Sequence, residues 1–207
     1  MRELSRFELR DCAEAFAFLG NTLLTPMNQT SDIGLDAAFW KSFPAFDANV
    51  RQAADDCSSY VAGIAESQES RAAAVQSVSV EFTQLFVGPP KPLAAPWETF
   101  YRSKNVKSGF GEPTYEMHQL LREAGLKVSN ENNQYADHMG IELLYVSALC
   151  DRASKGGDGQ DAIGEFLESH VQSWIGDFRK AVGDAVPDGY YIRILALAEA
   201  LVRYMSA

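Results

Sequence analysis

The chain has 207 residues, of which 46% are hydrophobic and 22% are charged, so its composition is that of an ordinary globular protein with one substantial core. Its 18 basic and 28 acidic residues give a net charge of -10, which disfavours nucleic acids and anionic membranes as partners and favours a basic peptide. No apolar stretch approaches the roughly 18 residues that a membrane span requires, so we expect no stable membrane insertion.

The first residues carry the acidic side chains Glu3, Glu8, Asp11 and Glu14, where a signal peptide would need a basic region and then an apolar one. The three cysteines, Cys12, Cys57 and Cys150, are widely separated and lie on apolar helix faces. Such dispersed thiols are typical of buried cysteines in a reducing compartment. We therefore expect a cytoplasmic protein.

Helical periodicity begins at the N-terminus. Ser5 and Glu8 have the spacing of a capping box, and apolar residues then recur at intervals of three and four until Leu23. This pattern predicts a first helix that ends before Pro26. Strand signals are nearly absent, because the β-branched cluster from Val75 to Val80 is interleaved with Gln and Ser and continues as helix.

Three more helices are predicted before residue 87. A short one is expected from Leu35 to Phe43, and Asp47 is expected to cap a longer one with an apolar face. Ser67 is expected to start the fourth, which continues to Phe86. That helix leads into a segment rich in proline and aromatic residues.

A proline-rich loop follows over residues 87–112. Prolines fix φ and lack an N–H donor, so the loop can be neither a helix interior nor a central strand. Long ordered loops with exposed aromatics are more often binding loops than tethers. The residues concerned are Pro89, Pro90, Pro92, Pro96, Trp97, Phe100 and Tyr101.

After the loop, Pro113 and Gly125 bracket another helix. Asp137 is expected to cap an apolar, central helix through Leu149, and Asp188 to cap the last helix. We therefore expect an all-α, single-domain helical bundle over residues 1–207. In it the loop 87–112 would link an N-terminal and a C-terminal helical lobe.

A set of short motifs follows in a fixed order from the end of the fourth predicted helix onward. The motifs are Leu85-Phe86, Gly88-Pro89, Pro96-Trp97-Glu98-Thr99, Tyr101, Phe110-Gly111, Asp137-His138, Gly140 and Glu142-Leu143, and more weakly Phe166, His170, Trp174, Phe178 and Tyr190-Tyr191. This order resembles the TorD/DmsD/NarJ family of redox-enzyme maturation chaperones. The similarity covers most of residues 80–205, and residues 1–79 match only as helices. Two positions depart from the usual pattern, because Ala95 and Tyr135 stand where the family often has proline.

The resemblance implies a non-enzymatic chaperone. Such a protein would bind the apo form or the twin-arginine leader of a molybdopterin-dependent oxidoreductase of the dimethyl sulfoxide reductase type, before export. It also implies a site in which carboxylates meet the leader's arginines and an apolar groove takes its apolar middle. The expected site residues are Leu85, Phe86, Pro96, Trp97, Glu98, Asp137 and His138. Exchange of helices across the flexible loops would give a homodimer.

Other interpretations of Asp137 and His138 stay open. Periodicity alone favours a helix cap and a packed side chain, whereas the resemblance implies a client contact. An acid–base pair would need a nucleophile and an orienting group that no recognisable signature supplies. A ligand-responsive transcription regulator also fits an all-α chain, but it would need a basic recognition helix, and residues 1–60 are mainly acidic.

No cofactor is expected from the sequence. His138 and Glu142 are four residues apart and could reach one metal ion, but with His118 and His170 they form no recognisable ligand spacing. We therefore assign no metal and treat His170 as a core histidine. No Gly-x-x-x-x-Gly-Lys-Ser/Thr loop occurs, so no nucleotide site of that type is predicted.

Overall fold

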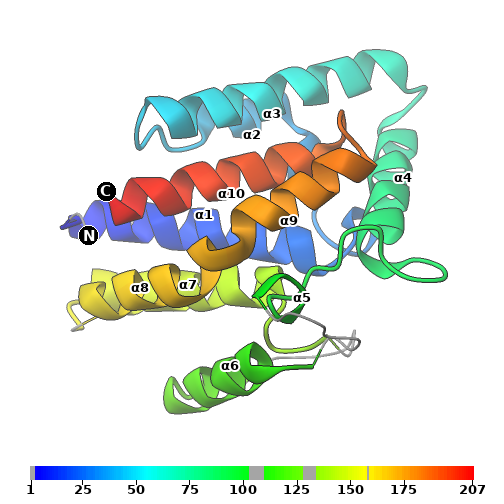
Figure 1. Ribbon diagram of the computed structural model, residues 1–207. Helices are drawn as coiled ribbons and strands as arrows, with labels where there is room; N and C mark the ends of the chain where they lie inside the picture. Colours follow the sequence, from blue (N-terminus) through cyan, green and yellow to red (C-terminus); the bar gives the residue numbers. More distant parts are fainter. Residues whose placement is uncertain (1–2, 103–109, 128–133, 158) are drawn as a thin grey trace. The chain divides into compact units, whose positions relative to one another are not determined.

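The computed structural model describes residues 3–102, 110–127, 134–157 and 159–207. Over these residues the chain forms α-helices with short 3-10 and π-helical turns, and it forms no β-strand (Figure 1). The predicted all-α fold class is confirmed. Among the helices of these segments, none combines the length and the apolar character needed to span a membrane.

The chain divides into two compact units that each combine distant parts of the sequence. The first contains residues 1–24 and 95–178 together with Ser206, and the second contains residues 25–94 and 179–205 together with Ala207. Each unit therefore draws on both halves of the chain, which differs from the expected N-terminal and C-terminal lobes. The boundary between residues 94 and 95 falls inside the predicted loop, and the single domain stays a prediction.

The first unit is built around α7 (Met139–Ser154), the helix that the sequence predicted to be central. It buries residues on every side, among them Ile141, Leu143, Val146 and Cys150, and it packs against α1 (Arg6–Leu24). The remaining elements are α5 (Thr99–Arg102), α6 (Glu112–Glu123), α8 (Gln160–Phe166), the π-helical turn η4 (Leu167–Val171) and the first part of α9 (Gln172–Ala185).

Two glycines let the backbones of α1 and α7 come close together. A Cβ atom on Gly140 would lie 2.7 Å from the carbonyl oxygen of Gly20, and a Cβ on Gly20 would lie 2.7 Å from that of Gly140. Because backbone atoms cannot swing aside as a flexible side chain can, any larger residue would push the two helices apart.

We expect Gly140→Ala to lower the free energy of unfolding by about 2 kcal/mol, the cost of overpacking. Gly63→Ala is the matched control, because nothing lies within 4 Å of a Cβ added to this helical glycine. The control should be neutral or stabilising by up to about 1 kcal/mol. Urea denaturation of both variants checks this, and equal effects would contradict the close approach.

The second unit contains η1 (Met27–Gln29), η2 (Ile33–Leu35), α2 (Ala37–Ser42), α3 (Ala48–Ser67), α4 (Arg71–Phe82), the π-helical turn η3 (Thr83–Val87), the end of α9 and nearly all of α10 (Tyr190–Ser206). A carboxylate from α4 holds the start of α10. Glu81 accepts hydrogen bonds from the backbone N–H groups of Tyr190 (3.0 Å) and Tyr191 (2.9 Å). Glu81 thereby takes the role that the sequence assigned to Asp188, which pairs instead with Arg193.

Other helix starts test the capping predictions. Ser5 and Glu8 form the predicted capping box, with the Ser5 N–H donating to Glu8 Oε2 over 2.9 Å and the Glu8 N–H to Ser5 Oγ over 3.3 Å. Asp47 caps α3 through the Val50 N–H at 2.8 Å. The predicted start at Ser67 is wrong, because α3 continues to that residue and Ser70 caps α4 through the Ala73 N–H.

Candidate functional site

The two motif-bearing segments meet in the first unit. Trp97 and His138 form an isolated antiparallel bridge. The Glu98 N–H donates to the Asp137 carbonyl oxygen over 2.9 Å, and the Met139 N–H donates to the Pro96 carbonyl oxygen over 2.9 Å. The structure therefore brings Pro96, Trp97 and Glu98 directly beside Asp137 and His138.

Asp137, two residues before α7, connects to α5 and α6 through hydrogen bonds. Its Oδ2 accepts from the Thr99 N–H (3.0 Å) and the Thr99 hydroxyl (2.6 Å), and its Oδ1 accepts from the Thr114 hydroxyl (2.9 Å). The side chain is fully buried, and burial raises the pKa of this carboxyl although the hydrogen bonds oppose the rise. In this conformation Asp137 cannot meet an arginine of a partner.

His138, rather than the predicted Asp137, is the N-cap of α7. Its Nδ1 accepts a hydrogen bond from the Gly140 N–H over 3.0 Å, and only 1% of the residue is exposed. Burial lowers the pKa of this imidazole to about 3, so the ring is neutral at physiological pH. A buried neutral ring with its Nδ1 engaged is poorly placed for the acid–base chemistry that the sequence left open.

Glu98 is also buried, in a cluster with Glu142 and His170. Its Oε1 accepts from Arg102 (2.6 Å) and its Oε2 lies 2.9 Å from His170 Nδ1. Burial alone would raise the pKa of Glu98, but the hydrogen bonds from His170 and Arg102 hold it below its usual range. The predicted contact between Glu98 and a leader arginine is therefore taken by Arg102 of the same chain.

Glu142 lies within the same cluster at full burial. The Trp174 indole N–H donates to its Oε2 over 3.0 Å, whereas its Oε1 has no hydrogen-bond partner among the described residues. Burial, and then the neighbouring charge of Glu98, raise the pKa of Glu142 well above its usual value.

Of the four residues expected to line an apolar groove, Leu85, Phe86 and Pro96 are buried and Trp97 is half-buried. Pro96 is buried in the first unit. Leu85 and Phe86 are 0% and 2% exposed and belong to the second unit, where the Phe86 ring packs against Tyr191 at a centroid distance of 5.1 Å. Leu85 and Phe86, which the resemblance implied as site residues, are therefore part of the core packing of the second unit.

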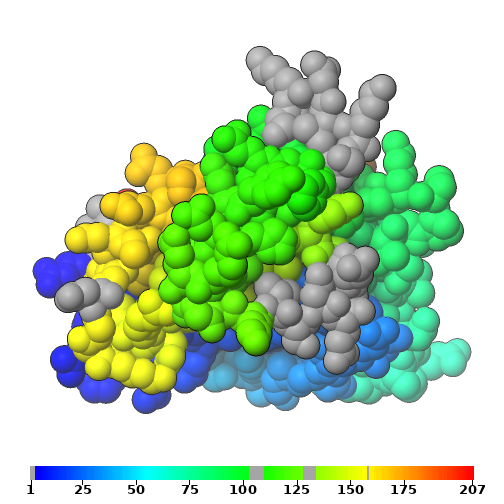
Figure 2. Space-filling model, turned by 90° about the horizontal axis from the view of Figure 1, so that it is seen from below, coloured from blue at the N-terminus to red at the C-terminus, as the bar shows by residue number. Residues whose placement is uncertain are grey.

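A continuous row of aromatic rings lies on the first unit. We call it the aromatic strip: Phe100, Trp97, Tyr135, Phe110 and Tyr115. Successive ring centroids are 5.8, 5.8, 5.8 and 4.8 Å apart. The exposed fractions are 41% for Phe100, 38% for Tyr135, 42% for Phe110 and 63% for Tyr115, and Trp97 is half-buried. The helix α6, which carries Tyr115, lies at the surface (Figure 2).

Exposed carboxylates lie on α6, the helix that carries Tyr115 of the strip. Glu112 and Glu116 are both exposed and stand on either side of Tyr115 in the sequence. Burial alone would lower the pKa of Arg102, but its hydrogen bond and ion pair with Glu98 raise it, and the charge of Glu116 adds to that rise. The exposed acidic groups of this region are thus on α6, not at Asp137 or Glu98.

Sequence reasoning missed Tyr115 and undervalued Phe110 and Tyr135. Tyr115 follows the buried Pro113 and Thr114 on an amphipathic helix, and its place on the outer face could have been found from that periodicity. Tyr101, one of the aromatic residues of the predicted loop, stacks on Trp174 at a ring-centroid distance of 5.3 Å. Trp97, from the same loop, is half-buried.

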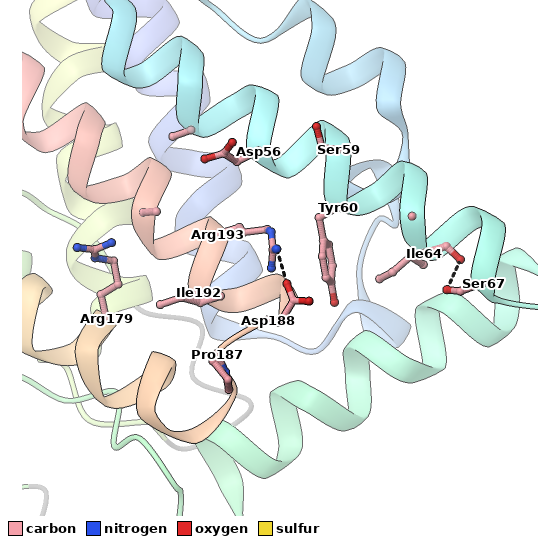
Figure 3. A pocket seen from close by; sticks show the side chains of 13 residues that line it. Asp56, Ser59, Tyr60, Ile64, Ser67, Arg179, Pro187, Asp188, Ile192 and Arg193 are labelled. Atoms are coloured by element: carbon pink, nitrogen blue, oxygen red, sulfur yellow. Dashed lines mark hydrogen bonds and ion pairs between the residues drawn. The ribbon is translucent and has the colours of Figure 1, made fainter.

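The second unit carries a separate cavity of about 640 Å3 between α3, α10 and the turn that precedes α10 (Figure 3). The guanidinium of Arg193 lies 4.3 Å from the ring centroid of Tyr60 and pairs with Asp188. Arg179 and Asp56 also line it, so both signs of charge are present. This mixed lining favours no single class of ligand.

Comparison with known proteins identifies the family. The family model described as nitrate reductase delta subunit matches residues 43–180. The chain is 26% identical to the chaperone protein TorD of Shewanella pealeana over 136 residues, which are 63% of this chain and 59% of that protein. It is 23% identical to the chaperone protein TorD of Vibrio cholerae over 141 residues, 65% of this chain and 63% of that protein. The chain therefore spans about three fifths of the length of these relatives.

Two further similarities extend over more of the chain. The chaperone protein TorD of Shewanella piezotolerans is 26% identical over 174 residues, 80% of this chain and 74% of that protein. A crystal structure of a candidate redox enzyme maturation protein from Archaeoglobus fulgidus covers 89% of this chain and 96% of its own, with 16% identity and a TM-score of 0.41. A TM-score of that size is too low to establish a shared fold.

Proposed function

Because the chain belongs to the nitrate reductase delta subunit family, which includes chaperones of the TorD type, we propose that it is a cytoplasmic, non-enzymatic chaperone. Its client would be the immature catalytic subunit of a molybdopterin-dependent oxidoreductase of the dimethyl sulfoxide reductase type. The chaperone would hold the apo enzyme, its twin-arginine leader, or both until the cofactor is inserted.

The aromatic strip is the observation that carries this proposal. Contiguous exposed apolar surface is uncommon on proteins without a partner and marks interaction sites. Tyr, Phe and Trp provide a large contact area for few rotatable bonds, so little conformational entropy is lost on binding. The strip therefore suits the apolar segment of a leader or an incompletely folded client.

Charge supports the same partner. A twin-arginine leader combines a basic front with an apolar middle, and Glu112 and Glu116 provide exposed carboxylates on the same helix as Tyr115. The net charge of -10 would attract such a segment over a distance. These glutamates replace Asp137 and Glu98 as our candidates for contact with the arginines.

We expect Tyr115→Ala to weaken binding of a twin-arginine leader peptide by about 10-fold or more, as for a truncated interface aromatic. The Tyr115 side chain is 63% exposed, so the fold should be unaffected. Phe7→Ala is the matched control, because Phe7 is an aromatic of the same unit that is 79% exposed and lies outside the strip. Fluorescence anisotropy of a labelled leader peptide measures the affinities of the wild type, Tyr115→Ala and Phe7→Ala.

Equal affinities of wild type, Tyr115→Ala and Phe7→Ala would remove the aromatic strip from the leader site. Trp97→Ala is expected to cost about 2 kcal/mol of binding or more, although its half-buried ring also contributes to packing. Thermal unfolding of each variant separates a loss of contact from a loss of fold.

A further inference from the structure

The buried cluster of Glu98, Glu142 and His170 has the donor set of a metal site. One oxygen of each carboxylate and one ring nitrogen of His170 lie within 4.8 Å of one another, close enough to contact a single ion. The residues come from three places in the first unit: the segment before α5, the first turn of α7 and the turn η4. All three are buried, with exposed fractions of 0%, 0% and 5%.

A second observation points to a ligand. Glu142 is completely buried, yet its Oε1 has no hydrogen-bond partner among the described residues, while its Oε2 is held by Trp174 at 3.0 Å. A buried carboxylate oxygen without a partner is costly. The neighbouring Glu98 carboxylate can accept a hydrogen bond from this carboxyl group only while Glu142 is protonated. One positive ion among Glu98, Glu142 and His170 would take the place of that proton.

Neighbouring side chains orient the carboxyl group of Glu98. Arg102 and Ser173 hold Glu98 Oε1, at 2.6 and 3.3 Å, and Oε2 is directed toward His170. Groups that orient metal ligands in this way are a regular part of protein metal sites.

We propose that Glu98, Glu142 and His170 bind a divalent first-row transition-metal ion, with Zn²⁺ as the preferred ion. Carboxylate oxygen and imidazole nitrogen are ligands that Zn²⁺ accepts, and three protein ligands leave a coordination position for water. The ion would take the place of the hydrogen bond between His170 and Glu98. It would tie the segment that carries Trp97 and Phe100 to α7 and η4.

The test uses the full-length chain after removal of metal with a chelator and dialysis. Isothermal titration calorimetry with zinc sulfate should give one ion per chain. Tryptophan fluorescence should change in the same titration, because Trp174 donates its indole N–H to Glu142. No client is needed, so the result is independent of the proposed chaperone function.

Glu142→Gln and His170→Gln should each weaken zinc binding by about 100-fold or more, since each removes a ligand. His118→Gln is the matched control, because His118 is exposed and lies outside the cluster, and it should bind zinc as wild type does. Circular dichroism verifies that each variant is folded. Glu142→Gln and His170→Gln test the site separately, because each removes a different ligand. Absence of zinc binding by the wild type at millimolar concentration would overturn the site, as would wild-type affinity in either folded ligand variant.

Discussion

Asp137→Ala is expected to lower the free energy of unfolding by about 3 kcal/mol or more. The substitution leaves the Thr99 N–H and the hydroxyls of Thr99 and Thr114 without their buried acceptor. Each hydrogen bond to a charged group contributes about 1.5–3 kcal/mol, and unpaired buried donors cost more than the lost bond. Urea denaturation, followed by circular dichroism, measures the change.

Asp177→Ala is the control for Asp137→Ala. Asp177 is an exposed aspartate on the part of α9 that belongs to the first unit, and its removal should change stability by about 0.5 kcal/mol or less. Similar effects of the two substitutions would show that Asp137 is not the structural anchor described above. A variant that keeps wild-type stability but loses leader binding would restore Asp137 as a client contact.

His138 should make the protein less stable in acid. The folded pKa of about 3 lies below the ordinary value of 6.5, so on acidification the unfolded chain binds a proton that the folded protein does not. Stability from this group is therefore complete above about pH 6.5 and is lost as the pH falls toward 3, with a slope of about 1.4 kcal/mol per pH unit in between. The loss should reach about 2 kcal/mol by pH 5 and about 5 kcal/mol in full.

His138→Asn isolates this contribution, since asparagine is a good N-cap but does not titrate. Asp137 and Glu142, whose pKa values are raised, titrate in the same region of the molecule and have the opposite sign. The difference between the wild-type and His138→Asn profiles cancels contributions that the two proteins share. His118→Asn is the control, and a His138→Asn profile parallel to wild type between pH 7.5 and 5 would contradict the account.

The helices were largely predictable from the sequence because their signals are local. The capping box at Ser5 and the Asp47 cap both depend on residues three positions apart, and both are present. The predicted cap of the last helix, Asp188, is wrong for a different reason. α10 is held by Glu81, a residue 109 positions before Tyr190, and no local pattern announces such a contact.

The site was predictable as a meeting of segments but not as a set of side-chain orientations. The Pro96–Glu98 segment and the Asp137-His138 pair do come together. Whether a carboxylate faces solvent or the interior depends on its partners, however, and those of Asp137 are Thr99 and Thr114 from other elements. Tyr135, which departs from the family's usual proline, lies in the middle of the aromatic strip.

Hydrogen–deuterium exchange with and without a twin-arginine leader peptide, or with the apo enzyme proposed as client, tests whether the aromatic strip is the binding surface. Binding at the strip should slow exchange in α5 and α6, the helices that carry Phe100 and Tyr115, and leave it unchanged in α3, which lines the cavity of the second unit. Protection confined to α3 and α10, with none in α5 or α6, would contradict the proposed site.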